Sequence, residues 1–195
     1  MSTAIVILAG GNSSRMGRPK QLLKFNGQTL LNIVITESLK TKFRPVVVVL
    51  GAYAAEIKQT STNPEVIYVV NEDWESGMSS SISSGLKTVL GSNTEIENAI
   101  ITVADQVHIS SEIFEALQSK QEQTQKNIVA SAYAQTTGAP TLFNKKYFEK
   151  LLALNGTIGA KSLIKKYVDD TVTIPFELGN IDIDTETDYN NLTHN

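Results

Sequence analysis

The stretch AIVILAGGNSSRMGRPK, Ala4 to Lys20, decides the fold because it places a glycine-rich, basic loop directly after a buried strand. Its first part, Ala4–Leu8, is a continuous apolar run rich in β-branched residues, which is typical of a strand buried on both faces. Three glycines, three small polar residues, two arginines and a lysine follow. Small residues let backbone N–H groups approach a ligand closely, and successive inward amides form an anion site. The stretch therefore predicts a phosphate-binding loop at the carboxyl end of a strand.

Four further apolar runs of this kind lie along the chain, with helical patterns between them. The runs cover Val46–Leu50, Val66–Val70, Ala99–Val103 and Ile128–Ala132. Apolar stripes at helical spacing follow the cap candidate Thr29 and the start signal Ser110-Ser111, and a third stripe contains Ile82, Leu86 and Leu90. Strands that alternate with helices predict a mostly parallel sheet with helices on both faces and right-handed crossovers. We therefore expect a three-layer α/β/α fold.

The last third of the chain is less regular. We expect short strands at Leu142-Phe143, Val172–Ile174 and Ile181–Ile183, and a small helix at Lys145–Leu154. No linker, repeat or low-complexity segment divides the sequence. We therefore expect residues 1–195 to form a single domain.

Composition narrows the class of protein. Hydrophobic residues make up 41% of the chain and charged residues 19%, as in soluble globular proteins. A chain without cysteine has no disulfides, no thiol nucleophile and no cysteine metal site. No apolar run reaches the ~18 residues of a membrane span, and Ala4–Leu8 runs into glycines rather than into a signal-peptide cleavage site. We expect a cytoplasmic protein that does not bind a membrane.

A net charge of −3 argues against general nucleic-acid binding, but the charges are unevenly distributed. The first acidic residue is Glu37, and before it stand Arg15, Arg18, Lys20 and Lys24. No Lys or Arg follows Lys166, whereas seven acidic residues do: Asp169, Asp170, Glu177, Asp182, Asp184, Glu186 and Asp188. Taken alone, each cluster also fits a solvated surface. The basic cluster lies on the glycine-rich loop, where its arginines and lysines would add charge to an anion site.

Ligands of an open parallel sheet bind outside the carboxyl ends of the strands, near a switch in strand order. The loop Ala9–Lys20, Gly51, Asn71–Asp73 and Ala104–Gln106 each follow a predicted strand, so they should share one crevice. Two well-known phosphate loops do not fit this sequence. A P-loop has four residues between its glycines and a lysine after the second, whereas here five residues separate the glycines and an arginine follows. The dinucleotide motif G-x-G-x-x-G is also absent, so neither a P-loop kinase nor a Rossmann oxidoreductase is favoured.

The loop LAGGNSSRMGRPK, Leu8–Lys20, resembles the signature of the nucleotidyltransferases related to MobA and MocA, which build molybdenum dinucleotide cofactors. Further stretches match this family in order: GMSSSISSGL (Gly77–Leu86), ADQV (Ala104–Val107) and DIDTETDY (Asp182–Tyr189), and more loosely GAPTLF (Gly138–Phe143) and NGTIGAKSLI (Asn155–Ile164). The resemblance implies a Rossmann-like fold of the nucleotide-diphospho-sugar transferase type. Within the family, Arg18-Pro19-Lys20 and the serine-rich stretch are similar to the cytidylyl-transferring MocA branch.

The sequence departs from the family pattern in three segments. Ala104 and Val107 replace the Gly and Pro that flank the acidic motif. Ala139 replaces a His that often precedes the proline of the GAP stretch, and Thr157 stands where relatives have Asp. In the family the last two segments lie on the acceptor side, so these departures leave the acceptor substrate open.

The resemblance implies transfer of CMP from CTP to the phosphate of molybdenum-bearing molybdopterin, with Mg²⁺ and release of pyrophosphate. It also implies transient contact with a molybdenum hydroxylase or its chaperone. An acceptor phosphate is already anionic, so the reaction needs no general base and depends on positioning and charge neutralisation. Alternatives are a MobA-type guanylyl transfer, a different phosphorylated acceptor or, in another class, a non-catalytic protein that binds a nucleotide and delivers the cofactor.

The predicted metal ligands are carboxylates. Asp105 follows Ala99–Val103 and is the first candidate, because Mg²⁺ prefers oxygen ligands such as carboxylates. Asp182 is the second candidate and Asp184 a weaker one. On a strand, both side chains would point away from the core face, which Ile181 and Ile183 would occupy.

The predicted catalytic residues are Lys20, Asp105 and Arg15, with Lys20 and Arg15 assigned to the triphosphate and the departing pyrophosphate. The family resemblance extends the nucleotide contacts to Leu8, Ala9, Gly10, Gly11, Arg15, Lys20, Gly77, Met78, Ser79, Ser80 and Ser81. Ser79 is also a candidate for the N-cap of the helix that begins in this stretch.

Overall fold

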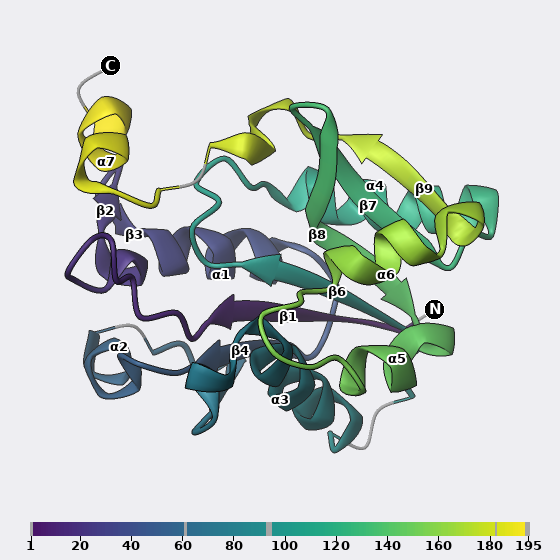
Figure 1. Ribbon diagram of the computed structural model, residues 1–195, viewed down its shortest axis with the longest axis horizontal. Coiled ribbons are helices and arrows are strands. Elements are labelled where there is room, and N and C mark those ends of the chain that lie inside the picture. The colour runs from purple at the N-terminus through teal and green to yellow at the C-terminus, as the bar shows by residue number, and fades with distance from the viewer. Residues whose placement is uncertain (1, 61, 93–94, 182, 194–195) are drawn as a thin grey trace.

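A seven-stranded sheet forms the centre of the protein (Figure 1). The computed structural model describes residues 2–60, 62–92, 95–181 and 183–193. The strands are β1 (Thr3–Ala9), β4 (Val46–Leu50), β5 (Val66–Val70), β6 (Asn98–Val103), β7 (Ile128–Tyr133), β8 (Thr136–Asn144) and β9 (Thr171–Pro175). They lie in the order β5-β4-β1-β6-β8-β7-β9, and among these seven only β8 runs antiparallel to its neighbours. The mostly parallel sheet expected from the sequence is confirmed.

Strand order reverses beside β1. The chain passes from β1 to β4 and β5 on one side, and then returns to place β6 on the other side of β1. Leu8 of β1 is in register with Val103 of β6, so the segments that follow these strands leave the sheet side by side. This is the switch point at which open α/β sheets form a crevice.

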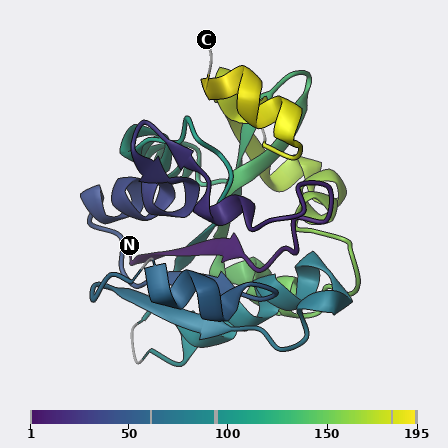
Figure 2. The same ribbon diagram turned by 90° about the vertical axis from the view of Figure 1, so that its left-hand side faces the viewer.

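Helices cover both faces of the sheet. They are α1 (Leu30–Lys40), α2 (Ala54–Thr60), α3 (Met78–Leu90), α4 (Ser111–Thr124), α5 (Phe148–Leu152), α6 (Lys161–Lys166) and α7 (Glu186–Thr193). Side chains alternate along β1, so Ile5 and Ile7 pack with α1 and α4 while Ala4 and Val6 pack with α3, α5 and α6. Figures 1 and 2 both show α1 and α3 on opposite sides of β1. None of the described helices is long and apolar enough to span a membrane.

The helix that follows β5 begins differently from the prediction. Helix α1 begins as expected, with the Thr29 hydroxyl accepting from the Asn32 amide at 3.2 Å. In α3, however, the N-cap is Gly77, which has a φ of 102°, so the assignment of Ser79 as the cap is wrong. The Ser79 hydroxyl instead donates to the carbonyl of Gly156 at 2.6 Å.

The C-terminal segment does not add a strand to the sheet. A 3-10 helix at Glu177–Asn180 turns the chain away after β9, and neither Ile181 nor Ile183 lies in a strand, so the expected strand there is wrong. Ile183 is still buried, in a third apolar cluster beneath α7. This cluster joins α7 to the short hairpin of β2 (Lys24–Phe25) and β3 (Gln28–Thr29), which lie together at the left of Figure 1.

A partly buried carboxylate, that of Asp170, fixes the start of β9. Asp170 accepts hydrogen bonds from the Asn127 amide at 3.1 Å, from Lys146 Nζ at 2.8 Å and from the Tyr147 hydroxyl at 2.9 Å. Burial alone would raise the pKa of Asp170, but the bonds from Lys146, Asn127 and Tyr147 outweigh it and lower the pKa to about 2. Burial, together with the contact to Asp170, raises the pKa of Tyr147 to about 12.

Asp170→Asn is expected to lower the free energy of unfolding at pH 7 by about 1–3 kcal/mol, because charge-assisted hydrogen bonds are lost. The pKa of Asp170 is below its ordinary value of 3.8 in the folded state, so its stabilisation is present above pH 3.8 and disappears as the pH falls through about 2. Urea unfolding should therefore show the same difference from the wild type at pH 7 and pH 5, and a smaller difference at pH 3. The exposed neighbour Asp169, changed to Asn, is the control; a difference that did not vary with pH would contradict the assignment.

Gly85 allows α3 to lie close to the sheet. A Cβ added at Gly85 would lie 2.4 Å from Cγ1 of Val6 and 2.8 Å from Cγ2 of Val49. Gly85→Ala is therefore expected to lower the free energy of unfolding by about 1–3 kcal/mol through overpacking. Gly91→Ala at the end of the same helix is the matched control: its φ is −77° and its nearest contact is 3.4 Å, so it should be neutral or stabilising by up to ~1 kcal/mol. If the two substitutions changed the free energy of unfolding equally, the close approach of α3 to the sheet at Gly85 would not contribute to stability.

Candidate active site

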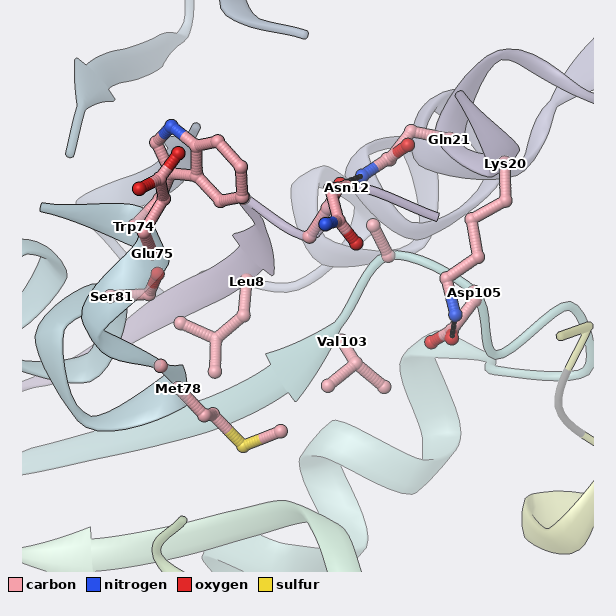
Figure 3. A pocket seen from close by; sticks show the side chains of 14 residues that line it. Leu8, Asn12, Lys20, Gln21, Trp74, Glu75, Met78, Ser81, Val103 and Asp105 are labelled. Atoms are coloured by element: carbon pink, nitrogen blue, oxygen red, sulfur yellow. Dashed lines mark hydrogen bonds and ion pairs between the residues drawn. The ribbon is translucent and has the colours of Figure 1, made fainter. Parts of the chain in front are cut away.

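A cavity of about 360 Å³ opens at the carboxyl ends of β1 and β6, beside the N-terminus of α3 (Figure 3). Its lining is Leu8, Gly10, Gly11, Asn12, Lys20, Gln21, Trp74, Glu75, Gly77, Met78, Ser81, Val103, Ala104 and Asp105. Leu8, Trp74, Met78 and Val103 form an apolar wall, while the loop and Asp105 supply the polar side. The N-terminal loop and the acidic motif thus share one crevice, as expected from the order of the strands, whereas the lining does not include Gly51, Asn71–Asp73 or Gln106, which were expected in the same crevice.

A buried glutamine, Gln21, holds the backbone of the glycine-rich loop in place. The Gln21 side chain is 2% exposed, and its Nε2 donates to the carbonyls of Ala9 at 2.9 Å and Gly11 at 3.0 Å. Gln21 belongs to a 3-10 helix at Lys20–Leu22, which places Lys20 at the cavity. Because its carbonyls are bonded to Gln21 on the protein side, the loop is fixed in shape where it borders the cavity.

Lys20 joins the loop to two carboxylates. Its Nζ lies 2.5 Å from Oδ2 of Asp105 and 3.0 Å from Oδ1 of Asp184 (Figure 3 shows the first pair). Arg15 completes the group, with Nη2 2.7 Å from the other oxygen of Asp184. The side chains of Lys20 and Asp105 are only 19% and 14% exposed, whereas that of Arg15 is 67% exposed.

The ion pairs of this group favour the charged forms of its members. Burial alone would lower the pKa of Lys20, but the attraction of Asp105 and Asp184 outweighs it and raises the pKa above its ordinary value. Burial would raise the pKa of Asp184, but the bonds and charges of Lys20 and Arg15 lower it overall. Lys20 is therefore a fixed positive charge at neutral pH.

Arg18 makes its contacts within the protein, with α7. Its guanidinium donates to both carboxylate oxygens of Glu186, at 2.7 and 3.0 Å, and lies 5.6 Å from the centre of the Tyr189 ring. It does not line the cavity. Arg18 therefore fastens the loop to α7.

Most of the serines at the start of α3 bond within the protein. The Ser80 hydroxyl donates to the carbonyl of Gly77 at 2.7 Å, and Asn71 Nδ2 donates to the hydroxyls of Ser80 at 2.8 Å and Ser81 at 3.1 Å. Ser81 lines the cavity, together with Gly77 and Met78, whereas Ser79 and Ser80 do not. Of the other predicted nucleotide contacts, Ala9 and Arg15 also lie outside the lining of the cavity.

Two carboxylates suit a divalent cation here. Asp105 and Asp184 both contact the same lysine nitrogen, so their oxygens already surround one positive charge. No group of three or more His, Cys, Asp or Glu side chains that could hold a metal occurs in the described part of the chain. Mg²⁺ needs no such group, because it is bound through one or two carboxylates together with phosphate oxygens and water. Asp182 lies outside the described residues, and its assignment as a ligand stays a prediction.

Two buried glutamines near the site bond to backbone carbonyls, a role that the sequence did not predict. One is Gln21; the other is Gln106, 3% exposed, whose Nε2 donates to the carbonyls of Ala139 at 2.8 Å and Gly179 at 3.3 Å. Gln21 fastens the N-terminal loop, and Gln106 fastens two backbone segments that are distant in the sequence. Neither stands out in the sequence, because a polar residue next to a loop normally indicates exposure.

A family model described as "MobA-like NTP transferase domain" matches residues 5–172. Two curated proteins are similar in sequence. The "Nicotine blue oxidoreductase" of Paenarthrobacter nicotinovorans is 41% identical over 81 residues, 41% of this chain and 40% of that protein. The "Probable molybdenum cofactor guanylyltransferase" of Natranaerobius thermophilus is 31% identical over 133 residues, 66% of this chain and 59% of that protein. The matched regions thus span less than two thirds of either relative.

Solved structures share the fold over the whole chain. Rv0371c from Mycobacterium tuberculosis H37Rv superposes with a TM-score of 0.85 and 22% identity, covering 100% of both chains. A structure of the same protein in complex with manganese gives a TM-score of 0.80 at 22% identity, covering 100% of this chain and 99% of that one. At this level of identity the likeness shows the fold alone.

Gln21→Met keeps the volume of the side chain but removes its two hydrogen bonds. We expect it to lower the free energy of unfolding by about 1–3 kcal/mol, because the carbonyls of Ala9 and Gly11 lose a donor. It should also weaken binding of a magnesium nucleoside triphosphate, since the loop is no longer held in shape. Urea unfolding and titration calorimetry measure the two effects, with the exposed Gln28→Met as control. Lost stability with unchanged affinity would show that Gln21 does not shape the binding loop.

Proposed function

The chain belongs to the MobA-like NTP transferase family, and from this premise we propose that it transfers CMP from CTP to the phosphate of molybdenum-bearing molybdopterin. The fold is the α/β fold of the nucleotide-diphospho-sugar transferases, and the protein is a nucleotidyltransferase. The nucleotide, the acceptor and the use of Mg²⁺ are the proposed parts.

One observation carries the proposal: a lysine on a glycine-rich loop faces two carboxylates at the switch point of the sheet. Fixed positive charge from Lys20 and Arg15 suits the triphosphate and the pyrophosphate that leaves. Asp105 and Asp184 are the oxygen donors for Mg²⁺, which when bound neutralises charge on the phosphate oxygens. Gly10 and Gly11 provide the close backbone approach, and a Cβ at Gly10 would lie 3.1 Å from the Ser81 hydroxyl oxygen.

In the proposed reaction an oxygen of the acceptor phosphate attacks the α-phosphorus of the nucleotide. A new P–O bond forms, the bond from the α-phosphorus to the bridging oxygen breaks, and pyrophosphate leaves with the electron pair. The attacking oxygen is already anionic, so no side chain has to remove a proton. This agrees with the position of His108, which packs its ring against Phe25 and does not line the cavity.

The choice of CTP rests on the similarity of Arg18-Pro19-Lys20 and the serine-rich stretch to the MocA branch. Arg18, Ser79 and Ser80 bond within the protein, so these residues would influence the nucleotide by shaping the loop and the start of α3. GTP is the second candidate, favoured by the name of the similar protein from Natranaerobius thermophilus. Trp74, Glu75 and Met78 line the same cavity.

We expect the protein to bind CTP more tightly than GTP in Mg²⁺ by titration calorimetry, and to release pyrophosphate when molybdenum-bearing molybdopterin is added. Asp105→Asn should reduce turnover by about 10²–10³-fold while leaving the fold intact, because an ionised ligand beside the transferred group is lost. Asp73→Asn, an exposed carboxylate close to the cavity, is the matched control and should keep its activity.

Three outcomes would change this proposal. Tighter binding of GTP would replace CMP by GMP as the transferred group. Pyrophosphate release only with another phosphorylated compound would change the acceptor. Failure to bind either nucleotide, or near wild-type turnover by Asp105→Asn, would contradict the assignment of the site.

A further inference from the structure

The groups assigned to the nucleotide and to the cation are bonded to one another in the structure. Lys20 and Arg15 carry two positive charges, and Asp105 and Asp184 carry two negative charges. Asp184 contacts both cations, one with each of its carboxylate oxygens. The four side chains therefore form a chain of ion pairs without net charge, of which Lys20 and Asp105 line the cavity.

We infer that nucleotide and metal binding are coupled through an exchange of partners within this group. Lys20 and Arg15 leave the carboxylates for phosphate oxygens of a nucleoside triphosphate, and the carboxylates of Asp105 and Asp184 become available to a divalent cation in the same event. This inference rests on the proposed function, but it concerns how the ligands bind and not which base or acceptor is used.

Either ligand alone leaves a charge without a partner. If a triphosphate takes Lys20 by itself, Asp105 stays unpaired although it is only 14% exposed, and it then faces a polyanion. If a cation takes the carboxylates by itself, Lys20 and Arg15 lose their partners and face the added positive charge. A partly buried charge without a partner is strongly unfavourable. When both ligands bind, every charge is paired, so each ligand strengthens the binding of the other.

Asp184 controls this coupling, because it is the member that holds Lys20 and Arg15 together. Its side chain is 35% exposed and accepts at 2.7 Å from Arg15 and at 3.0 Å from Lys20. Removing its charge frees Arg15 and leaves Lys20 with Asp105 as its one carboxylate partner, so both cations are held less strongly away from phosphate when no metal is present. A residue that only supported the shape of the site would have the opposite effect, because its loss would weaken nucleotide binding in every condition.

The test compares CTP binding by titration calorimetry in EDTA and in Mg²⁺. For the wild type we expect Mg²⁺ to strengthen CTP binding by about tenfold or more, within the usual range of coupling between ligands. Asp184→Asn should bind CTP in EDTA about three- to tenfold more tightly than the wild type, and should gain less from Mg²⁺. Asp73→Asn makes the same chemical change at an exposed carboxylate that pairs with neither Lys20 nor Arg15, and it should leave binding in EDTA nearly unchanged.

Loss of a negative charge also strengthens anion binding at a distance, so the exchange needs a separate test. A double-mutant cycle with Lys20→Met provides it. If the effect of Asp184→Asn runs through release of Lys20, the gain in EDTA should shrink in the Lys20→Met background. An equal gain in both backgrounds would overturn the inference, and so would weaker CTP binding by Asp184→Asn in EDTA. If the wild type binds neither CTP nor GTP in any condition, the proposed function itself fails.

Discussion

The positive charges of the N-terminal loop must be opposed by carboxylates that are distant in the sequence. Lys20 is 85 residues from Asp105 and 164 from Asp184, yet its nitrogen contacts both. The strand order makes this possible, because β6 lies next to β1 and delivers Asp105 beside the loop. Charges as little exposed as those of Lys20 and Asp105 are tolerated only when they are paired. The strand order is therefore needed for the charges of the site to be paired.

The shape of the loop is a second, smaller constraint. A loop whose amides are to face an anion must satisfy its carbonyls elsewhere, since buried backbone groups need partners. Gln21 meets this need on one side of the cavity, and Gln106 fastens Ala139 and Gly179 on the side where the C-terminal segment begins. A glutamine suits this role, because its NH₂ group offers two donors from one position. The two glutamine side chains thus hold backbone segments on either side of the charged group.

The sequence predicts well what depends on local pattern. Continuous apolar runs such as Val46–Leu50 are found as strands, and Thr29 caps its helix, because burial and capping act over a few residues. The neighbourhood of Asp105 and Lys20 follows from the strand-end rule. Tertiary contacts explain the failures. Ser79 bonds to Gly156 rather than capping α3, and the alternation around Ile183 reflects packing under α7 rather than a strand. Pairings such as that of Gln21 with Gly11 leave no periodic signal.

The opposite charges of the two ends of the chain are explained by contacts between them. Arg15 and Lys20 pair with Asp184, and Arg18 pairs with Glu186, so the basic start and the acidic end of the chain are in contact. The pairs of Arg15 with Asp184 and of Arg18 with Glu186 are exposed, and such pairs contribute only about 0–1 kcal/mol each, so the segment is held in place chiefly by the burial of Ile183. Those ion pairs can therefore exchange partners at little expense while the apolar contact stays. The matched family domain ends at residue 172, and the segment beyond it supplies Asp184, the carboxylate that joins both loop cations. A change in this segment would thus alter ligand binding without disturbing the sheet.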